Sequence, residues 1–360
     1  MKPSLLIGEN THRDLSDLLT EKRRLIISGA SNETAKSLLV GGILSFNPQP
    51  TILVTKDSNH TEALAHWLHF FEKEVQTLES VENENGEIIP NELQKFLLFM
   101  KKGHTNTFLC SRDTWDQDFP LYSHLIEKVL TLARKQEIHF TSIIETLIDL
   151  GYSHGEDLYL HPGEYRRTGD MFDIFPIQSE HPYRISLEFD AIESIISVDA
   201  NDASITTPHE GSLDIYPVVY EHTASLKDQL PADHLLILDD EDDVEPALQT
   251  KFLRFTPFPE SQENHAHLRY LSVLKFYTLT DFLNDIRDKL QQNWSLVIVT
   301  KRLDELKGIF EEEKIPHTIK AVQEHGRITL VGAEQNDLLP HSLQNPDLQS
   351  ALLTDREIFS

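Results

Sequence analysis

The chain has 360 residues, 39% of them hydrophobic, which suits roughly two to four soluble domains with buried cores. Its 32 basic and 59 acidic residues give a formal net charge of -27, which opposes contact with a phosphate backbone and disfavours direct DNA binding. The single cysteine, Cys110, excludes an intrachain disulfide, and the lack of a leader-like or long apolar stretch predicts a cytoplasmic protein without a membrane span.

Residues 1–120 are predicted to alternate between strands and helices. Apolar runs favour strands at residues 24–28, 51–55 and 107–110, and helices are expected near residues 34–44 and 91–100. A further helix, capped by Asn59 or Thr61, carries Leu64, Trp67, Leu68 and Phe71 on one stripe. Repeated strand-helix-strand units predict a parallel sheet with right-handed crossovers.

The loop after the first strand is where a nucleotide site would lie. Residues 30–37 keep the spacing of the phosphate-binding pattern G-x-x-x-x-G-K-[ST], with Lys36 and Ser37 in place, but Ala30 and Ala35 replace both glycines. A Cβ at those positions obstructs the close backbone approach to phosphates, and Glu33 adds a negative charge. The pattern predicts a degenerate loop without ATP, and a working divergent loop is the alternative.

A covering helix and a strand are predicted before residue 161. Ser142 and Glu145 have the spacing of a capping box, and Ile143, Ile144, Leu147 and Ile148 form an apolar stripe. Gly151 is a natural helix stop. A strand is expected at residues 157–160, leading into the next segment.

Residues 161–206 carry the most informative pattern of the chain. Tyr183, Ile185, Leu187 and Phe189 alternate with Arg184, Ser186, Glu188 and Asp190, the period of a strand with one buried face. Gly169 marks a turn, and a polar connection runs from Pro176 to Pro182. The segment predicts an antiparallel meander of three or four strands, and a sheet of unrelated ancestry with this pattern is the alternative to the resemblance that follows.

The run GEYRRTGDMFDIFPIQSEHPYRISLEFDAIESIISVDANDASI closely resembles part of the bacterial transcription-repair coupling factors and, more distantly, of the excision-repair protein UvrB. In those proteins the segment is a small sheet domain that contacts UvrA, and the resemblance implies the same partner here. It also implies a UvrB-like first domain that has lost its nucleotide motifs. Residues 75–93 are acidic and contain no tyrosine, unlike the aromatic hairpin that UvrB threads through DNA.

The family contacts carry over one position at a time. Arg184 matches the arginine of Pro-Tyr-Arg. The arginine before the glycine is replaced by Thr168, with Arg166 and Arg167 just ahead, and the aromatic position holds Glu188, with Phe189 one residue later. Strand alternation predicts that Phe189 points inward with Tyr183. Solvated surface charges are the alternative interpretation of the three arginines.

The remaining residues return to α/β structure. Residues 212–220 are predicted to rejoin the first sheet, followed by a strand at 235–238 and the acids Asp239, Asp240 and Glu241, which resemble a relic of the family's magnesium-binding strand; a solvated strand end is favoured over a metal site. After a linker near residues 257–264, helices at 279–290 and 303–313 and strands at 295–299, 327–331 and 351–354 predict a small α/β domain.

The predicted fold is therefore α/β: a degenerate RecA-like, P-loop NTPase-like domain (residues 1–120 plus 210–250), an inserted antiparallel UvrA-interaction domain (121–209) and a small α/β domain (265–360). We expect no catalytic residue, metal or cofactor. The expected function is a non-enzymatic scaffold that recruits UvrA in transcription-coupled repair and restrains the motor of an intact coupling factor, whose contacts with RNA polymerase and DNA belong to domains that we expect to lie outside this chain. The alternative is a UvrB-related ATP-binding repair protein.

Overall fold

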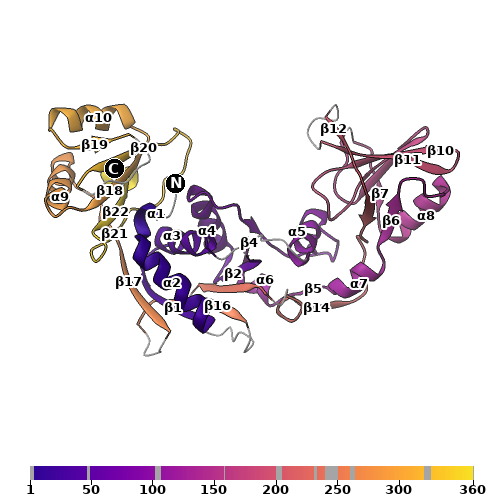
Figure 1. Ribbon diagram of the computed structural model, residues 1–360, viewed down its shortest axis with the longest axis horizontal. Coiled ribbons are helices and arrows are strands. Elements are labelled where there is room, and N and C mark those ends of the chain that lie inside the picture. Colours follow the sequence, from indigo (N-terminus) through magenta and orange to yellow (C-terminus); the bar gives the residue numbers. More distant parts are fainter. Residues whose placement is uncertain are drawn as a thin grey trace. The chain divides into compact units, whose positions relative to one another are not determined.

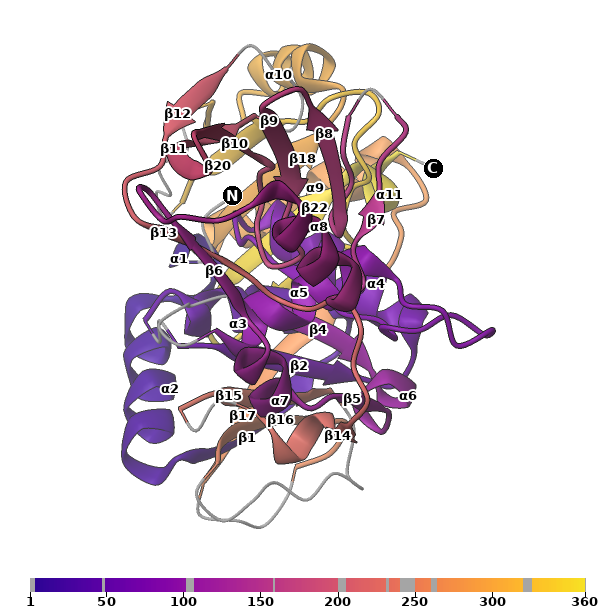
Figure 2. The same ribbon diagram turned by 90° about the vertical axis from the view of Figure 1, so that its right-hand side faces the viewer.

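The computed structural model describes residues 4–46, 49–101, 107–157, 159–199, 205–230, 233–239, 250–259, 264–319 and 326–359. The chain divides into two compact units, one formed by Met1–Thr77, Thr105–Arg112 and Ala232–Ser360 and the other by Leu78–His104 and Asp113–Pro231. Figures 1 and 2 show their elements. Within the described ranges, no helix has both the length and the apolar character that a bilayer span requires.

One half of the 12-stranded sheet in the first unit consists of parallel strands. In spatial order they are β17 (His265–Ser272), β1 (Arg24–Ala30), β16 (Lys251–Thr256), β15 (Leu235–Asp239), β2 (Thr51–Thr55), β4 (Thr107–Ser111) and β3 (Gln76–Thr77). The helices of this half are α1 (Ser4–Ile7), α2 (Glu9–Lys22), α3 (Glu33–Leu44) and α4 (Ser58–Phe70). The predicted parallel sheet is thus confirmed for the strands near residues 24, 51, 107 and 235.

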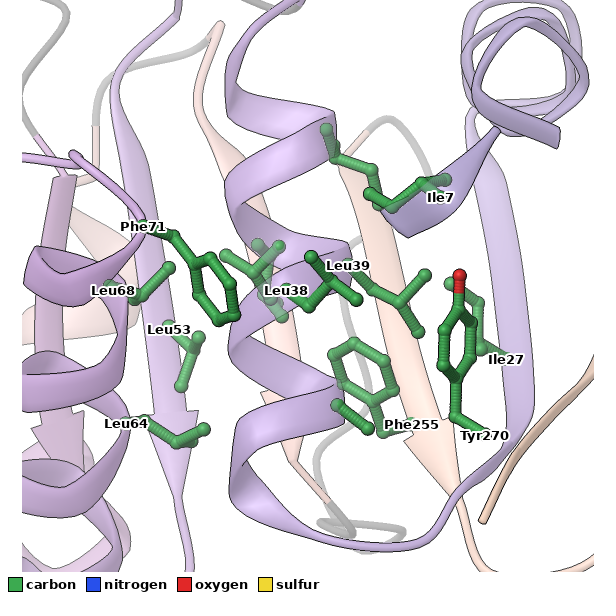
Figure 3. Packing of buried hydrophobic residues seen from close by; sticks show 14 of the residues in the cluster. Ile7, Ile27, Leu38, Leu39, Leu53, Leu64, Leu68, Phe71, Phe255 and Tyr270 are labelled. Atoms are coloured by element: carbon green, nitrogen blue, oxygen red, sulfur yellow. The ribbon is translucent and has the colours of Figure 1, made fainter. Parts of the chain in front are cut away.

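The core of this half lies between the sheet and α3 and α4. Figure 3 shows Leu38 and Leu39 of α3 between Phe71, at the end of α4, and Tyr270 of β17. All four side chains are buried. The helix stripe predicted around Leu64 is confirmed, but its cap is Asp57, whose side chain accepts a hydrogen bond from the backbone N of His60, and the predicted caps at Asn59 and Thr61 are wrong.

Gly29 explains how β1 and β17 approach so closely. Its φ is +82°, and a Cβ at this position would lie 1.8 Å from the backbone oxygen of Leu268. Only glycine tolerates both conditions. Gly29 therefore allows β1 to lie close to β17 just before the loop that leads to α3, where the predicted phosphate-binding pattern begins.

The other half of the sheet continues from β17 through β21 (Leu343–Asn345), β22 (Ser350–Thr354), β18 (Ser295–Thr300), β20 (Ile328–Gly332) and β19 (His317–Thr318). Its helices are α9 (Leu279–Gln291), α10 (Leu303–Glu312) and α11 (Asp355–Ile358). A separate core includes Phe282 of α9 and Phe310 of α10, whose rings stack 6.4 Å apart. The strands and helices predicted in residues 279–354 are confirmed.

The second unit is built on a six-stranded sheet in the order β12-β11-β10-β9-β8-β7. These strands are β7 (Ser153–His154), β8 (Glu164–Thr168), β9 (Met171–Phe175), β10 (Tyr183–Glu188), β11 (Ala191–Val198) and β12 (Thr206–Pro208). All neighbours are antiparallel except β7 and β8. Two smaller pairs join β6 (Leu130–Ala133) to β13 (Ser212–Ile215) and β5 (Asp118–Pro120) to β14 (Thr223–Ser225).

The helices of this second unit are α5 (Pro90–Met100), α7 (Tyr122–Glu127), α8 (Phe140–Asp149) and the short η1 (Leu226–Asp228), while α6 (Arg112–Trp115) begins at the boundary between the units. Both ribbon views place α8 beside the sheet. Ile143 and Leu147 of α8 are buried, which confirms the predicted covering helix.

Three local predictions in this unit are wrong. The helix α8 begins at Phe140 without a side-chain cap, so Ser142 lies inside its first turn rather than at its start. No strand forms at the described residues of 157–160; β7 lies earlier and pairs in parallel with β8. Residues 212–215 pair with β6 and do not return to the first sheet, which the chain rejoins at β15.

Candidate functional site

The turn between β10 and β11 presents an aromatic side chain to solvent. Glu188 pairs with Ala191, so Phe189 and Asp190 form the turn. Both have positive φ, 49° and 62°, as in a type I′ turn, a conformation that bulky residues seldom adopt. Phe189 is 95% exposed. The hairpin therefore holds an apolar ring in water on a strained backbone.

Residues 135–139, just before α8, hold this turn through hydrogen bonds and an ion pair. The backbone N of Ile138 donates to the Asp190 carbonyl at 2.8 Å, and the N of Lys135 donates to the Ile192 carbonyl at 2.7 Å. The His139 Nδ1 also lies 3.2 Å from the Asp190 carboxylate. These contacts fix the backbone of the strained turn, and so the point from which the ring projects, before any partner binds.

Two of the predicted arginines share one face of the sheet with an aspartate between them. Arg166 and Arg184 both pair across strands with Asp173. The Nε and Nη2 atoms of Arg184 donate to the two carboxylate oxygens of Asp173 at 2.7 and 3.0 Å. The Nη2 of Arg166 lies 3.9 Å from the same carboxylate, and its Nη1 donates to the Asp157 carbonyl at 2.7 Å.

Arg166, Asp173 and Arg184 are partly buried, which affects how strongly their charges interact. The Arg184 side chain is 34% exposed and that of Asp173 is 14% exposed. The hydrogen bond to Asp173 raises the pKa of Arg184 above its ordinary value, against the opposing effect of burial. Two guanidinium groups and one carboxylate give these three residues together a single positive formal charge, in a chain whose total is -27.

Arg167 lies on the opposite face. Successive side chains of a strand alternate between the two faces, so Arg167 points away from Arg166. Its cross-strand neighbour is the buried Phe172. Its guanidinium carbon lies 4.2 Å from the ring centroid of Phe140, at the start of α8, and its Nε donates to the Gly169 carbonyl at 3.1 Å. The structure therefore brings Arg166 and Arg184 together and separates Arg167 from them.

Glu188, the last of the predicted partner residues, and Thr168, which was not one of them, lie near the ends of the strands. Thr168 is exposed and pairs with Met171 beside the β8-β9 turn, and Glu188 is exposed at the end of β10. Ile185 is fully buried as the alternation predicted. The inward orientation predicted for Phe189 is wrong, because the strand ends at Glu188 and the turn follows.

The side chains of the predicted phosphate loop that the structure describes contact other parts of the first unit. The Lys36 Nζ lies 2.5 Å from Oδ1 of Asp239, at the end of β15, and their side chains are only 13% and 3% exposed. Ser37 is fully buried, and its hydroxyl donates to the Leu64 carbonyl at 3.3 Å. Both groups that would hold a phosphate and its metal thus contact protein atoms.

The two alanines complete this arrangement. Ala35 is fully buried, and its backbone N donates to the Asn32 side chain, which caps α3. Ala30 is half-buried at the end of β1, where it pairs with Tyr270. The solvated strand end predicted for Asp239 is wrong because this carboxylate is buried, while Asp240 and Glu241 lie outside the described residues.

No group of three or more histidine, cysteine, aspartate or glutamate side chains that could hold a metal ion occurs in the described part of the chain. One residue of the arginine face was missed from the sequence. This residue is Asp173, which lies in the apolar run MFDIF. Its alternation with apolar neighbours indicated a solvent-facing side chain on a strand. Its position between Arg166 and Arg184 depends on the pairing register of three strands, which the sequence does not give.

Comparison with known proteins places the sheet of the second unit in a family. Residues 130–222 match the UvrB interaction domain, so the chain contains this domain, with all the residues of the β8 to β11 face inside it. The transcription-repair-coupling factor of Borreliella burgdorferi is 30% identical over 105 residues, 29% of this chain and 9% of that protein. The UvrABC system protein B is 37% identical over 71 residues in Methanosphaera stadtmanae (20% of this chain, 11% of that protein) and 38% over 56 residues in Thermus thermophilus (16% and 8%). The aligned parts are thus a small fraction of each relative's length.

Proposed function

We propose that this chain is a non-enzymatic scaffold that recruits UvrA in nucleotide excision repair, as the UvrB-like front of a cytoplasmic transcription-repair coupling factor. The observation that carries the proposal is the UvrB interaction domain, which has paired arginines on one sheet face and an exposed phenylalanine in the β10-β11 turn. Arginine and aromatic side chains are the residue types that dominate binding energy at protein interfaces.

Phe189 supports the proposal because it is unfavourable for the isolated chain. This phenylalanine is 95% exposed, so it gains no free energy from burial, and its positive φ is an unfavourable backbone conformation for a bulky residue. Strained residues of this kind are concentrated at functional sites, and a partner that covers the ring would supply the missing burial. The two backbone hydrogen bonds from residues 135–138 hold it ready for such a partner.

The arginine face supports a protein partner rather than nucleic acid. The whole chain carries a formal charge of -27, and the positive charge beside Asp173 comes from Arg166 and Arg184. A few guanidinium groups can form directed bonds to carboxylates, whereas a phosphate backbone attracts an extended basic surface. We therefore assign this face to acidic side chains of UvrA.

The contacts around the degenerate loop support a scaffold without ATP turnover. We interpret the parallel sheet of the first unit as a RecA-like fold whose phosphate loop is closed. The pairing of Lys36 with Asp239, the burial of Ser37 and the Cβ atoms of Ala30 and Ala35 all oppose phosphate binding. The alternative is that magnesium-ATP displaces Asp239 from Lys36 and binds.

In an intact coupling factor, we infer that this chain also restrains the motor by intramolecular contact, while RNA polymerase and DNA bind elsewhere in that protein. The proposal places UvrA binding and this restraint in the same part of the polypeptide. Full-length protein would therefore show a higher basal ATPase activity when the 360 residues are deleted.

Capture of cognate UvrA by the immobilised chain tests the main proposal. Arg184→Glu should weaken binding by on the order of 2–4 kcal/mol, because it removes a partly buried charged anchor and leaves Asp173 beside a second acid. Arg269→Glu is the control for the change of charge, since Arg269 forms an exposed ion pair with Asp347 in the other unit. Equal capture by both variants would refute the interface, and calorimetric heat on titration with magnesium-ATP would favour the alternative.

A further inference from the structure

Asp173 touches both arginines on the exposed face of the six-stranded sheet, and it is the more buried partner of each pair. We propose that Asp173 is a positioning residue of the partner surface: its carboxylate holds Arg184 side-on, so that the outer end of the guanidinium faces a carboxylate of UvrA. This inference rests on the function proposed above and goes beyond it by assigning a role to a residue that would not itself contact the partner.

The pattern of hydrogen bonds to Arg184 carries the argument. A guanidinium group has five N–H donors. The pair with Asp173 uses the Nε and Nη2 atoms, which is the side of the fork. Of the three donors that are left, one on Nη1 and the second on Nη2 form the end of the fork. In the part of the chain that the structure describes, Asp173 is the acceptor for this group.

A side chain fixed in this way binds a partner at lower entropic cost. A free arginine loses rotamer freedom when it forms a bidentate pair, whereas one already held by a neighbouring strand has little left to lose. The pairing is set by the register of β9 and β10, in which Arg184 lies opposite Asp173. Arg166, opposite Asp173 on β8, is oriented by the Asp157 carbonyl and extends the same row.

Replacing Asp173 should change the affinity for UvrA in the direction opposite to the one that simple electrostatics predicts. Removing a negative charge from a surface that binds an acidic partner should strengthen binding if Asp173 contributes only its charge. If Asp173 orients Arg184, its loss should weaken binding although the repulsion falls. An Asp173 that serves only as an internal ion pair of the sheet would leave the affinity for UvrA unchanged.

Calorimetric titration of the full chain with cognate UvrA separates these cases. Asp173→Asn keeps the shape and should weaken binding about tenfold. Asp170→Asn is the matched control: this exposed acid in the β8-β9 turn contacts neither arginine, so its variant should bind UvrA as tightly as the wild type or slightly more tightly. Binding by Asp173→Asn that equals or exceeds that of wild type would overturn the inference.

Two further variants keep the test decisive. If Asp173 acts through Arg184, the double variant Asp173→Asn/Arg184→Ala should bind as weakly as Arg184→Ala alone, and additive losses would contradict the inference. Arg184→Lys keeps the charge but cannot hold Asp173 and offer an end-on pair together, so it should also lose about tenfold. Absence of binding by the wild type would instead refute the proposed function.

Discussion

Each unit of this protein sets a basic side chain against an aspartate, but the two pairs leave different chemistry available. In the first unit, Lys36 and Asp239 are 13% and 3% exposed and close the loop before α3. In the second, Arg184 and Asp173 are 34% and 14% exposed and lie on an open sheet face. In the function proposed above, the first pair would occupy the place of a phosphate, and the second would orient an arginine toward a partner.

The difference follows from side-chain geometry and burial. An ammonium group has three donors around one point charge, and in a buried position its carboxylate partner must compensate the lost hydration. A guanidinium group has five donors in a plane, so a carboxylate at one side leaves the other side usable. Two ion pairs of similar composition can therefore differ in the number of donors that they leave available.

The largest effect on stability is expected from a substitution that breaks the buried pair of Lys36 and Asp239. Lys36→Met removes the ammonium that neutralises the nearly inaccessible Asp239 carboxylate, so we expect the free energy of unfolding to fall by about 3 kcal/mol. Arg184→Met removes the equivalent partner on the exposed face and should cost only about 1 kcal/mol. Urea denaturation followed by circular dichroism measures both.

A compensating variant tests the cause of this loss. Lys36→Met combined with Asp239→Leu removes both charges from the buried position and should recover most of the stability. If the double variant remains as unstable as Lys36→Met, the loss comes from packing of the lysine stem rather than from the carboxylate. Equal losses for Lys36→Met and Arg184→Met would remove the contrast between the two pairs.

Phe189 sharpens the comparison because its two expected effects have opposite signs. Asparagine tolerates positive φ and suits the first position of a type I′ turn, so Phe189→Asn should stabilise the fold by roughly 0.5–1 kcal/mol. The same change removes the exposed ring and should weaken UvrA binding by about 2 kcal/mol. Thermal unfolding and calorimetric titration of one preparation give both numbers.

The matched control is Tyr277→Asn, which removes a 98% exposed aromatic ring from the first unit. It should leave UvrA binding unchanged, because this ring lies outside the UvrB interaction domain. A Phe189→Asn protein that binds UvrA normally would show that the strained turn serves something other than this interface.

The sequence predicted the elements whose periodicity is strong and missed what depends on register. The parallel strands near residues 24, 51 and 107 and the meander around residue 185 followed from apolar runs and alternation. The cap of α4 was misplaced by two or four residues because Asp57, Asn59 and Thr61 all have capping chemistry. Only the turn geometry distinguishes such neighbours.

The sequence named the residues of the candidate site, and that assignment stays a prediction, but it did not give their arrangement. Arg166, Arg167 and Arg184 looked like one group in the sequence, whereas strand alternation places Arg167 on the helix-covered face. The orientation of Phe189 was wrong because alternation was continued past the end of β10. Asp239 was expected to be solvated because its partner, Lys36, is about two hundred residues away in the chain.

The smallest expected effects separate the two arginines that are adjacent in sequence. Arg166→Ala removes a guanidinium from the exposed row and should weaken UvrA binding by about 1 kcal/mol without changing stability by more than about 0.5 kcal/mol. Arg167→Ala removes the contact over the Phe140 ring and should instead lower the free energy of unfolding by about 0.5–1 kcal/mol. Titration with UvrA and thermal unfolding of both variants form a two-by-two comparison in which each arginine controls one observable. A loss of UvrA affinity in Arg167→Ala as large as that in Arg166→Ala would mean that the partner reaches both faces of the sheet at the β8-β9 turn, and the single-face interface would have to be abandoned.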